Sequence, residues 1–178
     1  MTPPPVEKSI TIAAGPDAAF RRFTTEIATW WPLRTHSVGQ ADAERWVFEE
    51  RVGGRIYEVI RGGRESVWGI VTAWEPPRRV AFTWYPDRTP ETAQQVVEVR
   101  FVPQGERTRV ELTHSGWERY GAQARRAHRG YRLGWAYVLR LYAGRRLSPL
   151  VLALDAVMWV ALRLAPRGRQ APSTSEAG

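Results

Sequence analysis

The sequence predicts an α+β fold in which a strongly curved antiparallel sheet of about seven strands closes over a long C-terminal helix. Two observations carry this expectation. Strand-like runs recur at hairpin spacing between residues 45 and 114, separated by glycine pairs and other turn residues. An apolar stripe with helical spacing then runs through residues 118–143. The length of 178 residues suits one domain with a core of its own and an appendage.

The strands are predicted from alternating apolar residues and from the turns between them. A first strand is expected over residues 7–13. Gly53-Gly54 and Gly62-Gly63 mark tight turns between later strands. The six further strands are expected over residues 45–52, 55–60, 65–74, 78–85, 94–102 and 107–114. Short connections of this kind join antiparallel neighbours, which excludes a doubly wound parallel sheet.

A first helix is predicted to begin at Gly15-Pro16-Asp17, because proline suits the first turn and an acidic residue suits the positive helix end. Pro32 ends this helix. Its buried face recurs in steps of three and four residues, and consists of Phe20, Phe23, Ile27 and Trp30 or Trp31.

The long helix is expected over residues 118–143. Gly121, Gly130 and Gly134 each weaken it by about 1 kcal/mol relative to alanine, so they need a compensating reason, such as close approach to the sheet or space for a ligand. Its apolar stripe consists of Tyr120, Ala124, Ala127, Tyr131, Trp135, Val138 and Tyr142.

Three segments flank this domain, which is expected over residues 6–143. The proline-rich residues 1–5 and the polar tail 167–178 are expected to be disordered. Residues 144–166 are expected to form an additional apolar helix.

The formal net charge of +8 lies entirely in the C-terminal third of the chain. Residues 1–117 contain 15 basic and 15 acidic residues, whereas residues 118–178 contain 11 and 3. Such a region suits anionic lipid, nucleic acid or an acidic partner. Nucleic acid is the least favoured, because the basic residues are not interleaved with aromatic residues in a recognised motif.

Composition also bears on the compartment. The sequence has no cysteine, which excludes disulfides and thiolate chemistry, and its first residues lack an apolar signal core. We therefore expect a cytoplasmic protein, peripheral at the inner face of the membrane if the C-terminal segment binds there.

The order and spacing of several short motifs resemble those of the SRPBCC, or START-like, helix-grip superfamily, and within it the AHSA-like branch related to activators of a heat-shock chaperone ATPase. The resemblance covers about residues 6–142. It implies a hydrophobic cavity between the sheet and the long helix, since relatives bind lipids, sterols or polyketides and some are cyclases or hydrolases. The motifs are Pro16-Asp17 with Phe20, Trp30-Trp31-Pro32, Gly53-Gly54-Arg55, Trp68-Gly69 with Val71, Trp74-Glu75-Pro76-Pro77, Phe82-Thr83-Trp84, Thr108-Arg109-Val110, Leu112-Thr113-His114, Gly116-Trp117 and Gly134-Trp135.

Aromatic residues are the principal candidates for ligand binding. The chain has 9 Trp, and several come from elements that would enclose one cavity. Ligand pockets are mostly apolar with a few polar groups, although part of such a set fills the core instead. The candidate ligand-binding residues are Trp30, Trp31, Tyr57, Trp68, Trp84, His114, Trp117, Tyr131 and Trp135.

His114 and Glu58 are the candidates for catalysis. His114 shares a strand face with Val110 and Leu112, so it points inward, where an imidazole can act as a general acid or base or serve a structural role beside Trp117. Glu58 shares a face with isoleucines, and that face is either the cavity or the outside of the sheet. The three histidines lack metal-ligand spacing and no glycine-rich phosphate loop precedes a helix, so no metal and no cofactor is expected.

Residues 147–165 form an almost continuously apolar segment flanked by arginines. Its length is near the lower limit for a membrane span, and Asp155 at its centre costs about 3 kcal/mol on insertion. Packing on the domain or on a second copy and binding to an anionic membrane surface are favoured over spanning.

Three functions remain open from the sequence. The first is binding of a small hydrophobic ligand, such as a lipid, a polyketide or an aromatic compound. The second is a cyclase- or hydrolase-like reaction that uses His114 or Glu58 in the same cavity. The third is a membrane-associated interaction protein that acts through its C-terminal helix. We favour binding without catalysis, because no catalytic motif is present.

Overall fold

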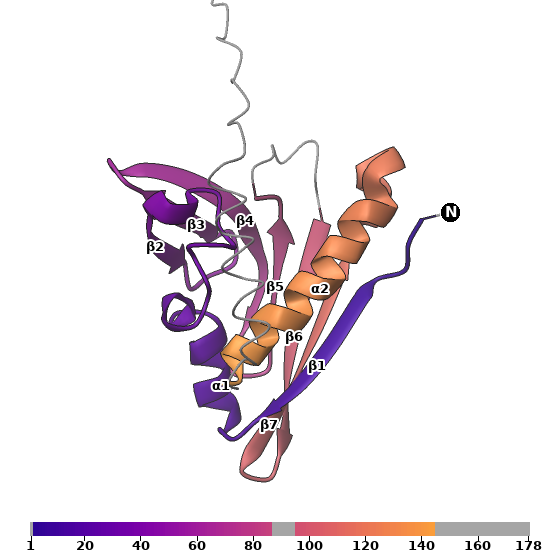
Figure 1. Cartoon of the computed structure of the whole chain (residues 1–178). Coiled ribbons are helices and arrows are strands. Elements are labelled where there is room, and N and C mark those ends of the chain that lie inside the picture. The colour runs from indigo at the N-terminus through magenta and orange to yellow at the C-terminus, as the bar shows by residue number, and fades with distance from the viewer. Residues whose placement is uncertain (1, 87–94, 145–178) are drawn as a thin grey trace, which may run out of the picture.

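The computed structural model describes residues 2–86 and 95–144, where one seven-stranded antiparallel sheet curls around a single long helix, α2 (Figure 1). Three short 3₁₀ helices (η) and one short α-helix complete the domain. In chain order the elements are β1 (Val6–Ile12), α1 (Pro16–Phe23), η1 (Ile27–Thr29), η2 (Gln40–Asp42), β2 (Ala43–Phe48), β3 (Arg55–Ile60), β4 (Arg64–Glu75), β5 (Arg79–Trp84), β6 (Gln95–Gln104), β7 (Arg107–Ser115), η3 (Trp117–Gln123) and α2 (Ala124–Tyr142).

The predicted sheet is confirmed in strand number, direction and approximate bounds. The spatial order is β1-β7-β6-β5-β4-β3-β2, so each strand from β2 to β7 pairs with its neighbour in sequence. The first strand closes the other edge against the last one, with Val6 opposite His114 and Ile12 opposite Thr108. This topology brings the two ends of the strand region together beside α2.

The predicted first helix is wrong in its length. A single helix to Pro32 was expected, but α1 ends at Phe23 and a separate 3₁₀ turn follows at Ile27–Thr29. Thr24 explains the break, because its backbone leaves helical geometry and its hydroxyl donates to the carbonyl of Phe20 at 2.8 Å. The predicted face is nevertheless buried throughout.

The long helix begins six residues later than predicted. Gly121 adopts φ 51° and ψ −128°, a conformation that only glycine enters readily, so the chain turns there between η3 and α2. From Ala124 onward the predicted stripe packs toward the sheet, with Trp135, Val138 and Tyr142 all buried.

Strands β4 and β5 approach each other closely at Gly69, where a larger residue would not fit. A Cβ atom added there would meet the backbone carbonyl oxygen of Thr83 in β5. The same Thr83 accepts a hydrogen bond on its hydroxyl from the amide of Ile70, at 2.8 Å. The irregular register of β4 therefore depends on this glycine, and it places Trp68 and Trp84 beside each other on the inner face.

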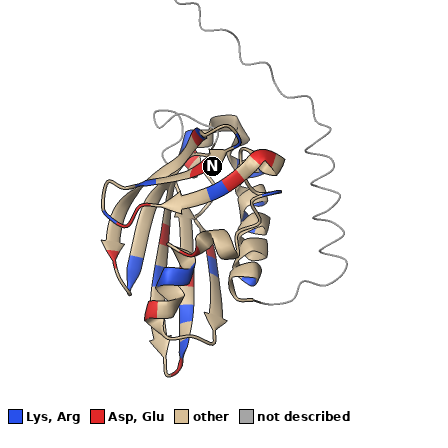
Figure 2. Cartoon of the chain, turned by 90° about the vertical axis from the view of Figure 1, so that its left-hand side faces the viewer, with Lys and Arg blue, Asp and Glu red and all other residues tan. Residues whose placement is uncertain are grey.

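The outer surface divides by charge. Both signs alternate on the sheet, whereas α2 carries five arginines and no acidic residue (Figure 2). On the sheet, Glu98 forms an ion pair with Arg100 at 2.7 Å and a second ion pair with Arg79 at 2.8 Å.

The flanking segments are described only in part. Residues 2–5 contain no helix or strand. The predicted apolar segment 147–165 and the tail 167–178 lie outside the described residues. Within residues 2–86 and 95–144, no helix is long and apolar enough to cross a membrane.

Candidate functional site

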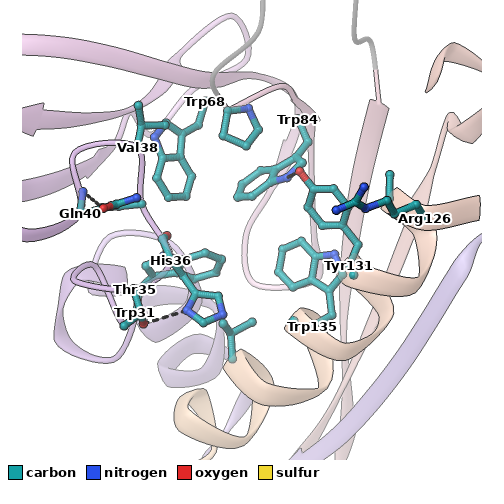
Figure 3. A pocket seen from close by; sticks show the side chains of 16 residues that line it. Trp31, Thr35, His36, Val38, Gln40, Trp68, Trp84, Arg126, Tyr131 and Trp135 are labelled. Carbon is teal, nitrogen blue, oxygen red and sulfur yellow. Dashed lines mark hydrogen bonds between the residues drawn. The ribbon is translucent and has the colours of Figure 1, made fainter. Parts of the chain in front are cut away.

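A pocket of about 590 Å³ lies between α2, the inner faces of β4 and β5 at Trp68 and Trp84, and the loop that follows η1 (Figure 3). This volume falls in the range of small-molecule sites. Its lining residues are Trp31, Thr35, His36, Ser37, Val38, Gln40, Trp68, Trp84, Pro86, Arg126, Ala127, Gly130, Tyr131, Gly134, Trp135 and Val138.

The walls of the pocket are aromatic. The ring centroids of Trp68 and Trp84 are 5.3 Å apart, and those of Trp84 and Trp135 are 5.5 Å apart. Trp31 closes the ring on the other side, 5.8 Å from Trp68 and 6.0 Å from Trp135. All four pairs are edge-to-face or tilted, the arrangements that aromatic rings prefer over a face-to-face stack.

The loop after η1 forms the polar side of the pocket. The indole nitrogen of Trp31 donates to the carbonyl oxygen of His36 at 2.7 Å, and the imidazole of His36 lies 2.9 Å from the hydroxyl of Thr35. The same imidazole stacks on Tyr137 of α2, with centroids 5.0 Å apart and planes 19° apart. These contacts hold the loop against the helix and present hydroxyl and amide groups beside the aromatic wall.

Helix α2 contributes the opposite side. Tyr131 accepts a hydrogen bond on its hydroxyl from the indole of Trp84, at 3.3 Å. Gly130 and Gly134 also line the pocket, and a Cβ atom on either would meet nothing within 4 Å. Both glycines therefore leave open space in the pocket, and neither permits a close contact between α2 and the sheet.

His114 lies directly behind the aromatic wall. It is completely buried, and its Nδ1 accepts a hydrogen bond from the indole nitrogen of Trp135 at 2.9 Å. Burial, together with the nearby His128, lowers the pKa of His114 to about 3, so the ring is neutral near pH 7. Because Nδ1 is the acceptor, the ring proton is placed on Nε2. The ring also contacts Tyr131 and Trp117, at centroid distances of 4.8 and 4.5 Å.

Glu58 is completely buried on the inner face of β3, which excludes the outer-face alternative. Its carboxylate accepts a hydrogen bond from the backbone amide of Gly39 at 2.6 Å. This contact anchors the far end of the polar loop to the sheet.

The comparisons with known proteins agree with this architecture. The family model described as "Activator of Hsp90 ATPase homolog 1-like protein" matches residues 13–141, most of the chain. The chain belongs to this family. Among curated proteins no sequence matches it.

Three solved structures are similar to this chain. A protein of Mesorhizobium loti is 21% identical with a TM-score of 0.59, over 79% of this chain and 95% of that one. An anthrahydroquino-gamma-pyrone synthase is 38% identical with a TM-score of 0.52, over 71% of this chain and 86% of that one. A self-sacrificing resistance protein, CalC of Micromonospora echinospora, is 23% identical with a TM-score of 0.56, over 79% and 92%. The first and third show similarity of fold alone.

The structure brings only part of the predicted site together. Five of the predicted ligand-binding residues line the pocket: Trp31, Trp68, Trp84, Tyr131 and Trp135. His114 does not line it, but contacts two residues that do. Glu58 does not line it either and is linked to it through the loop.

Three predicted ligand-binding residues lie elsewhere. Trp30 packs in the core against Phe23 and Tyr142. Tyr57 lies on the outer face of β3, under the guanidinium of Arg55, because strand alternation puts it opposite to its neighbours. Trp117 packs on His114 and is not part of the lining.

Sequence reasoning missed the polar loop and Arg126 as parts of the pocket. The loop reads only as a polar connection, and Arg126 as one of several exposed arginines. A usable signal was present, since a long loop directly after two tryptophans is a common location for functional side chains. Among the residues that the structure describes, no cluster of His, Asp or Glu suits a metal ion.

Proposed function

We propose that this protein binds a planar, predominantly aromatic small molecule of the polyketide class in the pocket between α2 and the loop after η1. The observation that carries the proposal is the wall of four tryptophans and one tyrosine around about 590 Å³. Stacked and edge-to-face contacts with such a wall favour flat, conjugated molecules over saturated ones of equal area.

Two further observations support an aromatic ligand. Gly130 and Gly134 keep space open on α2 at a cost in helix stability of about 1 kcal/mol each. The 38%-identical relative is by its printed name a synthase of an anthrahydroquino-gamma-pyrone, a polycyclic aromatic compound.

The test uses one strand that carries both a pocket tryptophan and a control. Trp68 lines the pocket, whereas Trp74 of the same strand packs against Phe20 at 5.0 Å on the α1 side. Titration with anthraquinone-2-carboxamide, followed by tryptophan fluorescence and calorimetry, should give saturable one-to-one binding. Trp68→Phe should weaken it about tenfold through lost ring contact, and Trp74→Phe less than twofold.

Two results would reject the proposal. One is the absence of binding by a panel of planar aromatic probes, and the other is an equal effect of both substitutions. Native mass spectrometry of the protein purified from its own host supplies an independent readout, since a retained ligand adds a defined mass.

Catalysis in the same pocket is a second candidate, favoured by the synthase relative alone. Among the described lining residues, Tyr131 and His36 are then the candidates for general acid–base catalysis, whereas His114 is buried behind the wall. Product analysis after incubation with an anthrahydroquinone precursor tests it: turnover should fall in Tyr131→Phe and His36→Gln while binding of the carboxamide probe persists. Turnover that survives in both variants would exclude these roles.

A further inference from the structure

The charges of the pocket lining are one-sided. Among the sixteen lining residues that the structure describes, Arg126 is the single residue with a permanent charge, and none is acidic. In Figure 3, Arg126 lies beside Tyr131, on the opposite side of the pocket from Thr35, His36 and Gln40. An aromatic ligand that fills this space therefore meets a cation at one side.

Arg126 is not explained by the stability of the fold. It lies in the first turn of α2, where the helix dipole disfavours a positive charge, and that turn contains no acidic residue. Among the described residues it has no ion-pair partner. A side chain that opposes the local electrostatic preference, with no compensating acidic partner among residues 2–86 and 95–144, suggests a functional constraint.

We infer that the pocket selects an aromatic ligand carrying an oxyanion conjugated to the ring system, either a carboxylate or an ionised enol or phenol, and that Arg126 binds this group. The inference rests on the proposed function and names the class of ligand more narrowly. A guanidinium matches a carboxylate with two parallel N–H donors. Because Arg126 is exposed, solvent keeps the energy of this ion pair moderate. The hydroxyl and amide groups of the polar loop then face the other end of the ligand.

The chain offers a matched control for Arg126. Arg125 precedes it in the same turn, carries the same charge, and lies on the other side of α2, beside Arg129 and Arg132. Replacing either arginine by glutamine removes one unit of charge from the same helix end, so a difference between the variants reports contact and not the general field.

The experiment compares two probes of nearly equal shape, anthraquinone-2-carboxylate and anthraquinone-2-carboxamide, with the wild type, R126Q and R125Q. We expect the wild type to bind the carboxylate about tenfold more tightly than the carboxamide. R126Q should abolish this preference, mainly by weakening the binding of the carboxylate, and R125Q should keep the preference within about twofold. Added salt should reduce the preference in the wild type.

The outcomes separate the two proposals. If neither probe binds, the proposed function fails and the role of Arg126 fails with it. If the carboxamide binds as tightly as the carboxylate, or if R125Q and R126Q lose equal preference, aromatic binding stands and the anionic selectivity is rejected. To distinguish a carboxylate from an ionised phenol, 2-hydroxyanthraquinone is titrated above and below its own pKa. Selective binding of its ionised form, lost in R126Q, extends the class to phenolates, and its absence restricts the class to carboxylates.

Discussion

The indole nitrogen of Trp135 donates a hydrogen bond to Nδ1 of His114 over 2.9 Å, and this contact joins the last strand to the long helix behind the pocket. Trp135 forms part of the pocket wall, whereas His114 is completely buried and does not touch the pocket. His114 therefore orients one wall of the pocket without lining it.

The first prediction concerns the pH dependence of stability. The pKa of His114 is about 3 in the folded protein and about 6.5 in an unfolded chain, so between these values the unfolded state binds more protons. The contribution of the neutral ring is complete above pH 6.5 and is lost as the pH falls toward 3. The free energy of unfolding should decline by up to about 1.4 kcal/mol per pH unit in this window.

Urea unfolding at pH 7, 6 and 5 measures this slope. His114→Asn keeps a hydrogen-bond acceptor for Trp135 but cannot be protonated, so it serves as the reference that subtracts the other titrating groups. A wild-type slope equal to that of the variant would show that His114 does not titrate with the predicted pKa.

The second prediction concerns Gly134. Gly134→Ala should raise the free energy of unfolding by about 1 kcal/mol, because alanine is the better helix former and its Cβ meets nothing within 4 Å. The same methyl group enters the pocket, so affinity for the carboxamide probe should fall several-fold. Leu133→Ala, at a position that is 63% exposed, should leave affinity unchanged. Higher stability with unaltered affinity would contradict a role for Gly134 in ligand space.

The third prediction concerns Gly69. Gly69→Ala should destabilise the fold by about 3 kcal/mol or more, because the added Cβ collides with the carbonyl of Thr83 in the neighbouring strand. Thermal and chemical unfolding of the purified variant test this. Gly15→Ala, where nothing lies within 4 Å, should cost about 1 kcal/mol or less. Comparable losses in both variants would mean that the strands adjust to a side chain at Gly69.

The fourth prediction separates the domain from its C-terminal extension. The lining residues that the structure describes lie between Trp31 and Val138, so a chain ending at Gly144 should keep the carboxamide affinity within about twofold of the full chain. If residues 147–165 bind membranes, only the full chain should sediment with vesicles containing phosphatidylserine. If they associate with a second copy, light scattering should show a dimer only for the full chain. Equal behaviour of both chains would remove either role from this segment.

The sequence by itself determined the sheet, its order of elements and the inward orientation of His114, because these depend on local rules. Strand alternation, glycine turns and short connections operate over a few residues. The face on which a strand residue lies follows from whether its position along the strand is odd or even. The breaks at Thr24 and Gly121 were not predicted, since both depend on whether a local side-chain hydrogen bond or a backbone conformation overrides the helical pattern.

Only the tertiary structure decided which aromatic residues surround the pocket and which fill the core. Trp30 and Trp31 are adjacent in sequence, yet Trp30 packs against Tyr142 in the core and Trp31 lines the pocket. The polar loop and Arg126 are about ninety residues apart in the chain, and the closure of the sheet over α2 brings them to opposite sides of one pocket. Such long-range juxtaposition follows from packing, on which local patterns carry no information.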